Sequence, residues 1–131
     1  MILIHTSIRT SNMDKSIDFY TRLMGLKLLS RRKIPQNDAE IAFLRDPDGK
    51  GARLELTFFR KQKSFVQAKY EERVFDHVAF EIKNMKETMS ILQKNKVTVT
   101  DEHYKPSPTG PIIAFIEDPD GTLIELIEKR K

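Results

Sequence analysis

The chain has 131 residues, a length that suits one compact domain or two small modules sharing a core. Its hydrophobic fraction of 39% and charged fraction of 32% indicate a globular fold, and the absence of cysteine excludes disulfides, thiolate metal sites and cysteine nucleophiles. The net charge of +4 resides largely in short basic runs without interleaved aromatic residues, a pattern that favours solvated loops over a nucleic-acid surface. No segment approaches the length of a membrane span, and we expect a cytoplasmic protein with neither nucleic-acid nor membrane partners.

The first part of the chain is predicted to contain a strand, a helix and three further strands. Residues 2–9 alternate, with Ile2, Ile4 and Ile8 on one face and His5, Ser7 and Arg9 on the other. Ser11 or Asn12 can cap a helix that ends near Gly25, with an apolar stripe formed by Met13, Ile17, Tyr20 and Met24. Strands are expected around 26–30 and at 40–45 and 53–59, with a turn at the sequence DPDG between the last two.

The same order is predicted a second time. A strand at 76–82 precedes a helix that Asn84 can cap, whose apolar stripe contains Met85, Met89 and Leu92. Further strands are expected at 96–100, 111–117 and 121–128. His103 and Tyr104 are expected in a surface loop.

A repeated phrase connects the two parts. The letters IAFLRDPDG (41–49) return as IAFIEDPDG (113–121), 72 residues later, with seven of nine identical. His5 and Asn12 have counterparts at the same offset, His77 and Asn84. We therefore predict an α+β fold of two tandem βαβββ modules in one domain (1–131): module 1 (1–60), a polar linker (61–73) and module 2 (74–131).

Polar residues recur at matching positions of the two modules. Glu125 shares its strand face with Leu123 and Ile127, and a carboxylate among apolar side chains is costly unless it is paired or binds metal. Glu55, between Arg53 and Thr57, could instead face solvent.

The repeat favours a functional interpretation. Each module carries a histidine in its first strand and a glutamate in its last strand. If the modules pack with twofold pseudosymmetry, two imidazoles and two carboxylates meet, a donor set that suits Ni, Co, Fe, Mn or Zn. The four candidate ligands are His5, Glu55, His77 and Glu125.

Most of the chain resembles glyoxalase I (lactoylglutathione lyase), of the vicinal-oxygen-chelate or glyoxalase–bleomycin resistance superfamily. The resemblance rests on IHTSIRTSNMDKSIDFYTRLMGLKLL, LELTF, HVAFEI and IAFIEDPDGTLIELIE. It implies curved mixed sheets around a metal site. It also implies an isomerase that converts the hemithioacetal of methylglyoxal and glutathione to a thioester through an enediolate.

The resemblance assigns roles to individual residues. His5, Glu55, His77 and Glu125 would bind one divalent metal, nickel or cobalt being favoured over zinc, manganese or iron. Glu125 would be the catalytic base and Glu55 a second acid–base group. Family members of this size are usually homodimers with sites at the interface, which would take one His–Glu pair from each chain.

Thiol recognition departs from the family pattern. Arg9 and Arg73 match arginines that contact glutathione in family members, although both also suit an ordinary protein surface. Phe59 occupies the position of a glutathione-contacting asparagine, whose hydrogen bonds a phenyl ring cannot replace. The thiol is therefore held differently or is another thiol, and the basic run RKQK (60–63) could favour a more anionic carrier such as coenzyme A.

Two alternatives remain open at this level. A methylmalonyl-CoA epimerase-like enzyme would use similar proton transfer, but that family usually carries HHI where this chain has DHVAF. A non-catalytic small-molecule-binding protein of the same superfamily would have no need for two costly carboxylates.

Overall fold

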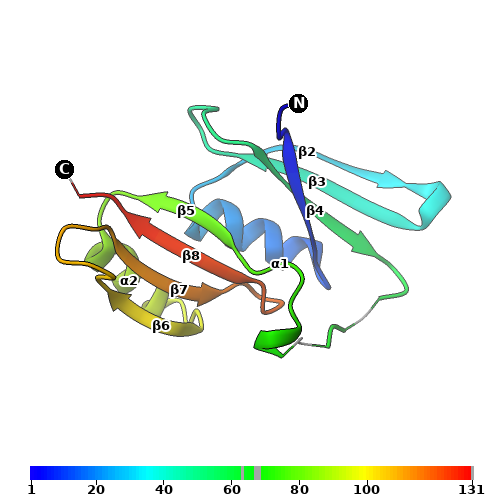
Figure 1. Ribbon diagram of the computed structural model, residues 1–131. Helices are drawn as coiled ribbons and strands as arrows, with labels where there is room; N and C mark the ends of the chain where they lie inside the picture. The colour runs from blue at the N-terminus through cyan, green and yellow to red at the C-terminus, as the bar shows by residue number, and fades with distance from the viewer. Residues whose placement is uncertain (63, 67–68, 131) are drawn as a thin grey trace. The chain divides into compact units, whose positions relative to one another are not determined.

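The structure is a computed structural model that describes residues 1–62, 64–66 and 69–130, without the side chains of 103 and 104 (Figure 1). The chain divides into two compact units, Met1–Val66 and Gln67–Lys131, which contain module 1 and module 2 respectively. Among the described residues, no helix combines the length and the apolarity needed to cross a membrane.

Module 1 forms a four-stranded mixed sheet with a helix packed against it. The strand order is β1-β4-β3-β2, with β1 parallel to β4 and the other neighbours antiparallel. Its elements are β1 (His5–Arg9), α1 (Met13–Asp18), the π-helical turn η1 (Phe19–Leu23), β2 (Lys27–Ile34), the 3-10 turn η2 (Pro35–Asn37), β3 (Ala39–Arg45) and β4 (Arg53–Phe59).

Module 2 repeats this topology in its own sheet. The order is β5-β8-β7-β6, and β5 lies parallel to β8 as β1 does to β4 (Figure 1). Its elements are the 3-10 turn η3 (Tyr70–Glu72), β5 (Val78–Ile82), α2 (Met85–Lys94), β6 (Val99–Tyr104), β7 (Ile112–Glu117) and β8 (Leu123–Glu128). The predicted α+β class is confirmed, and the βαβββ order is present in both modules.

Both helices begin at an asparagine cap. The Asn12 side chain accepts a hydrogen bond from the Lys15 backbone N–H at 3.1 Å, and Asn84 accepts one from the Glu87 N–H at 3.0 Å. Each cap satisfies a backbone donor that has no partner within the helix. The repeated asparagine therefore has the same structural role in the two modules.

The apolar stripe predicted for the first helix is partly wrong. Ile17 and Met24 are only half-buried, whereas Ser16 and Phe19 are buried. The displacement of Met24 follows from the π-helical turn, in which the Met24 N–H donates to the Phe19 carbonyl five residues earlier. A π-turn takes more residues per turn than an α-helix and rotates the following side chains away from the expected face.

The first strand begins later than predicted. It starts at His5, whose partner Arg53 is the first residue of β4, so residues 2–4 have no strand beside them. Ile2 and Ile4, which we expected on one strand face with Ile8, are consequently exposed at 87% and 58%.

Two other strands differ in extent. The strand β2 continues to Ile34, beyond the predicted 26–30, because it pairs with β3 as far as Ala39. The strand β6 begins at Val99 rather than 96, because residues 96 and 97 close the end of α2 by donating to the carbonyls of Gln93 and Leu92. The expectation of a loop at 103–104 was therefore wrong: both residues end β6, and their side chains lie outside the described part of the structure.

The repeated phrase forms matched hairpin turns. Gly49 and Gly121 adopt positive φ angles of 67° and 86°, which glycine tolerates without strain. The Asp46 carboxylate accepts hydrogen bonds from the backbone N–H groups of Gly51 and Lys50, and these hold the pKa of Asp46 below its ordinary value. Asp118 accepts comparable hydrogen bonds in the shorter second turn.

Strand alternation separates a buried face from an opposite face in each sheet. The buried side chains include Leu54 and Leu56 in module 1 and Ile124 and Leu126 in module 2. Glu55 and Glu125 lie between these leucine and isoleucine positions and point to the opposite face, because successive strand residues alternate. That opposite face carries the candidate site residues.

Candidate metal and acid–base site

In module 1 the parallel pairing of β1 with β4 brings a histidine beside a glutamate. Ser7 is the direct strand partner of Glu55, and His5 lies two residues earlier on the same face. The His5 Nε2 atom is 3.7 Å from Glu55 Oε2. The hydroxyls of Ser7 and Thr57 each donate to the other carboxylate oxygen, Glu55 Oε1, at 2.9 Å. Glu55 therefore has one oxygen held by two hydroxyls and one directed at the imidazole.

The His5 ring is held by packing rather than by a hydrogen bond. Its centroid lies 5.3 Å from that of Phe43 in an edge-to-face arrangement. Phe43 is in turn the strand partner of Glu55 and carries the Arg53 guanidinium 4.7 Å above its ring. Among the described residues, the buried Nδ1 atom of His5 has no hydrogen-bond partner.

Module 2 brings together the equivalent residues with closer contacts. His77 immediately precedes β5, and its Nε2 atom lies 2.9 Å from Glu125 Oε2 in β8. Its Nδ1 atom lies 2.6 Å from the carboxylate of Asp76. Phe115, the strand partner of Glu125, packs edge-to-face against the ring at 5.6 Å. Both nitrogens of His77 therefore face carboxylates.

The two glutamates differ in their neighbours but not in their burial. Each side chain is 16% exposed, so Glu55 is no more open to solvent than Glu125. Ala79 is the strand partner of Glu125, in the position that Ser7 has beside Glu55. Ile127 follows Glu125 by two residues, as Thr57 follows Glu55. Apolar side chains thus occupy the two positions from which hydroxyls bind Glu55.

These residues fit the donor set of a divalent metal. Two ligand atoms that each lie ~2.1 Å from a metal, at about a right angle, are ~3 Å apart. The imidazole–carboxylate separations of 2.9 and 3.7 Å are close to that value, and nitrogen with oxygen suits borderline and hard divalent ions. Within the described ranges, no group of three or more His, Asp or Glu side chains is arranged so that it could hold a metal ion, so each module contributes two candidate ligands.

The candidate thiol-binding residues of module 1 form a compact group. The Arg9 guanidinium stacks over the Phe59 ring at 4.1 Å and donates to the Gln62 amide oxygen at 3.1 Å. Arg73 directly follows η3, at the end of the predicted linker and within the second compact unit. Lys63, part of the basic run noted in the sequence, is outside the described residues.

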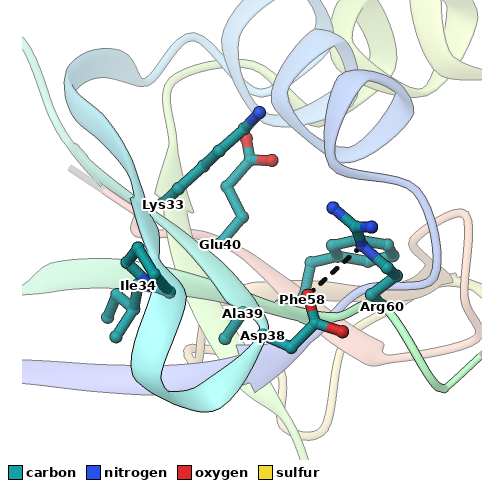
Figure 2. Close-up of a pocket in the computed structure, with 8 residues that line it drawn as sticks. Lys33, Ile34, Asp38, Ala39, Glu40, Phe58 and Arg60 are labelled. Carbon is teal, nitrogen blue, oxygen red and sulfur yellow. Dashed lines mark ion pairs between the residues drawn. The ribbon is translucent and has the colours of Figure 1, made fainter.

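A separate pocket of about 240 Å³ lies at the tip of the β2–β3 hairpin (Figure 2). Both lining carboxylates are in ion pairs, Asp38 with Arg60 at 3.3 Å and Glu40 with Arg31. Glu40 is the strand partner of Phe58, which alternates with Thr57 and so points away from the Glu55 face. The pocket is therefore not part of the His5–Glu55 pair. Its lining residues are Lys33, Ile34, Pro35, Asp38, Ala39, Glu40, Phe58 and Arg60.

Comparison with known proteins decides the family. A family model described as Glyoxalase/Bleomycin resistance protein/Dioxygenase superfamily matches residues 2–126. The chain belongs to this superfamily. The lactoylglutathione lyase of Escherichia coli O157:H7 is 36% identical, with 99% of this chain and 94% of that protein covered. The lactoylglutathione lyase of Neisseria meningitidis serogroup A is 31% identical, with 99% and 92% covered.

Solved structures from the glyoxalase superfamily share the fold. Glyoxalase I of Leishmania major, described as trypanothione-dependent, matches with a TM-score of 0.80 at 29% identity, over 98% of this chain and 86% of that one. Glyoxalase I of Zea mays matches with a TM-score of 0.84 at 26% identity, over 98% of this chain and 45% of that one. The resemblance found in the sequence is confirmed.

Several residues beside this glyoxalase-superfamily site were missed by sequence reasoning. Phe43 and Phe115 could have been identified from the sequence, because they stand at the same place in the repeated phrase. Asp76 was visible as part of VFDH, but its contact with His77 was not. Gln62 had no signal, because its approach to Arg9 depends on how the chain turns after β4.

Proposed function

We propose that this chain is a metal-dependent glyoxalase I-type isomerase, with carbon–sulfur lyase chemistry. It converts the hemithioacetal of a 2-oxoaldehyde such as methylglyoxal and a thiol into a 2-hydroxyacyl thioester. The observation that carries the proposal is the pairing of a histidine with a glutamate in each module, on the sheet face opposite the buried one. Relatives named lactoylglutathione lyase, 31–36% identical over nearly the whole chain, support it.

His5, Glu55, His77 and Glu125 are the proposed ligands of one divalent ion per site. The two modules are proposed to form one domain, and each supplies half of this set. A bound divalent ion would polarise the two neighbouring oxygens of the substrate and so ease loss of a proton from carbon. Nickel or cobalt is the proposed ion.

Glu125 is the proposed base. It takes the proton from C1 of the hemithioacetal and returns it to C2, while the hydroxyl proton passes from the C1 oxygen to the C2 oxygen, so that the substrate is isomerised without loss or gain of atoms. Its surroundings support this role, because Ala79 and Ile127 offer it no hydrogen bonds through their side chains. Glu55 accepts two hydroxyl hydrogen bonds on Oε1, which suits a carboxylate that stays oriented as a ligand and serves as a second acid–base group.

Arg9 is proposed to bind a carboxylate of the thiol. Phe59 and Gln62 support the guanidinium from two sides, which compensates for the missing asparagine by fixing Arg9. Arg73 is a second proposed contact. Among the relatives, the bacterial enzymes are named for glutathione and the Leishmania enzyme is described as trypanothione-dependent, so the thiol differs within this group. Glutathione is the first candidate here.

The proposed assembly is a cytoplasmic homodimer with sites at the interface. One chain would supply His5 and Glu55 to each site, and its partner would supply the pair from module 2. Exchange of differently inactivated chains tests this: a mixture of His5→Ala and His77→Ala proteins should form one intact site per heterodimer. Recovery of activity in that mixture is expected only for shared sites.

The decisive experiment is a rate assay on metal-free protein. Nickel, cobalt, manganese and zinc are added in turn, with methylglyoxal and glutathione, trypanothione or coenzyme A as the thiol. We expect thioester formation that requires metal and is abolished in His77→Ala, while the exposed-helix variant Glu87→Gln retains full activity. Metal-loaded protein that turns over none of these adducts would refute the proposed function.

A further inference from the structure

We propose that Asp76 is a positioning residue that fixes the imidazole of His77 with Nε2 directed at Glu125. The proposal rests on the proposed function, because it concerns a ligand of the proposed metal site. Asp76 stands directly before His77 in the sequence DHVAF. The equivalent residue of module 1, directly before His5, is the aliphatic Ile4.

The contacts of His77 define its orientation. The Asp76 carboxylate lies 2.6 Å from Nδ1, and Glu125 lies 2.9 Å from Nε2 on the far side of the ring. A neutral ring carries one hydrogen, and the Asp76 contact is the shorter of the two, so we assign that hydrogen to Nδ1, which donates it to the Asp76 carboxylate. Nε2 is then the nitrogen whose lone pair is available to a metal. Phe115 packs edge-on against the same ring and limits its rotation.

Module 1 provides an internal comparison. Ile4 precedes His5 as Asp76 precedes His77, and its aliphatic side chain cannot accept a hydrogen bond. The His5 Nδ1 atom is buried without a hydrogen-bond partner in the described part of the chain. Each histidine otherwise has a phenylalanine packed edge-on against its ring and a glutamate on the Nε2 side, at 3.7 Å in module 1 and 2.9 Å in module 2. The carboxylate at Nδ1 is therefore the main difference between the two histidines.

A carboxylate in this position has a known effect on metal binding. Hydrogen bonding at the second nitrogen of a ligating histidine fixes its tautomer and ring orientation, and loss of that partner typically lowers metal affinity about 10–100-fold. The Asp76 side chain is 56% exposed, so its replacement leaves the core of module 2 unchanged. The side chain can thus be altered with little risk to the fold.

The test measures nickel affinity by calorimetry on the full-length, metal-free protein. Asp76→Ala is expected to weaken nickel binding about 10–100-fold. Asp76→Asn keeps a hydrogen-bond acceptor and should recover part of the loss. Asp101→Ala, which removes an exposed aspartate elsewhere in module 2, should bind nickel as the wild type does. Ile4→Asp should tighten binding by giving His5 the partner that it lacks.

A second readout observes the ring itself. In zinc-loaded protein, NMR should detect a slowly exchanging His77 Nδ1–H proton that disappears in Asp76→Ala and persists in Asp101→Ala. Absence of that proton from the wild type would overturn the proposal.

The affinities separate this proposal from the proposed function. Wild-type protein that binds nickel no better than Asp76→Ala overturns the role of Asp76 and leaves the proposed function standing. Equal losses in Asp76→Ala and Asp76→Asn would assign the effect to charge and likewise overturn ring positioning. Wild-type protein that binds no divalent ion overturns the proposed function and this proposal with it.

Discussion

Module 1 and module 2 use the same strand pairing to bring a histidine beside a glutamate, yet they surround the two glutamates with opposite chemistry. Glu55 is bonded by the hydroxyls of Ser7 and Thr57, and Glu125 has Ala79 and Ile127 in the same places. The duplicated backbone therefore determines where the carboxylates lie. The neighbouring side chains determine how many hydrogen bonds each carboxylate accepts.

For the two histidines, it is the module 2 residue that has more polar contacts. His77 has a carboxylate beside each ring nitrogen, whereas His5 has a buried nitrogen without a partner within the described residues. Module 2 thus combines the better-held imidazole with the less-bonded carboxylate. We interpret module 2 as the reactive half of the proposed site and module 1 as the half that holds ligands.

The largest expected effect separates the two glutamates. At saturating nickel, Glu125→Gln should lower kcat by about 10²–10⁴-fold, the usual contribution of a general base. Glu55→Gln should act mainly by weakening metal binding, with a smaller loss of kcat once metal is saturating. Steady-state kinetics with matched metal occupancy measure both. Equal losses of kcat would remove the distinction between the modules.

Matched core truncations test whether the modules fold as one unit. Leu56 and Leu126 are both fully buried at equivalent places in β4 and β8. Replacement of either by alanine should cost about 2–5 kcal/mol in the free energy of unfolding. In one cooperative domain, both variants shift the same single transition in urea denaturation. Two separable transitions, each sensitive to one variant, would show independent modules.

Transplanting hydroxyls into module 2 should make Glu125 resemble Glu55. The double variant Ala79→Ser with Ile127→Thr offers Glu125 two new donors, and hydrogen bonds to a charged group stabilise it by about 1.5–3 kcal/mol each. We expect kcat to fall about tenfold or more at saturating metal. The reverse variant, Ser7→Ala with Thr57→Val, should leave kcat nearly unchanged. An unaffected kcat in the first variant would contradict the role given to the apolar surroundings.

The fourth residue after each histidine provides a further contrast. It is Arg9 in module 1 and Glu81 in module 2. Arg9→Ala should raise the KM for the thiol adduct about tenfold, with kcat retained, through loss of a charge-assisted hydrogen bond. Glu81→Ala, whose side chain is paired with Lys129, is the control and should change neither constant. A fall in kcat without a change in KM would argue against carboxylate binding by Arg9.

The smallest expected effect concerns the longer first turn. Backbone N–H groups of Gly51 and Lys50 lower the pKa of Asp46 in the folded state, so the ionised carboxylate stabilises the fold above the unfolded-state pKa of about 4. This contribution is lost as pH falls through the lower folded-state pKa. Asp46→Asn should therefore lower Tm at neutral pH, and its difference from the wild type should shrink in acid. A difference that is constant with pH would contradict this account.

Much of this architecture was predictable from local chemistry. The repeat, the asparagine caps and the alternation of strands indicated two βαβββ modules and the faces on which His5 and Glu55 lie. These features depend on residues close in sequence, whose geometry follows from backbone periodicity.

Other features depend on contacts that no local pattern encodes. The π-turn at Phe19 and the start of β1 at His5 depend on how these segments pack against and pair with neighbouring elements. The approach of Gln62 to Arg9 and of Ala79 to Glu125 depends on register and loop path. The sequence therefore indicated the candidate ligands. The difference between the surroundings of Glu55 and Glu125 became visible only once the strand pairing was known.

The parallel pairing of the first strand with the last has a consequence for synthesis. His5 is synthesised before its neighbour Glu55, which belongs to the strand that completes the module, and His77 stands in the same relation to Glu125. A chain that is cut short within either module therefore lacks half of a pair. On the proposed function, the full ligand set needs both modules to be finished, so an ion bound only to the full set would favour the complete chain over its fragments.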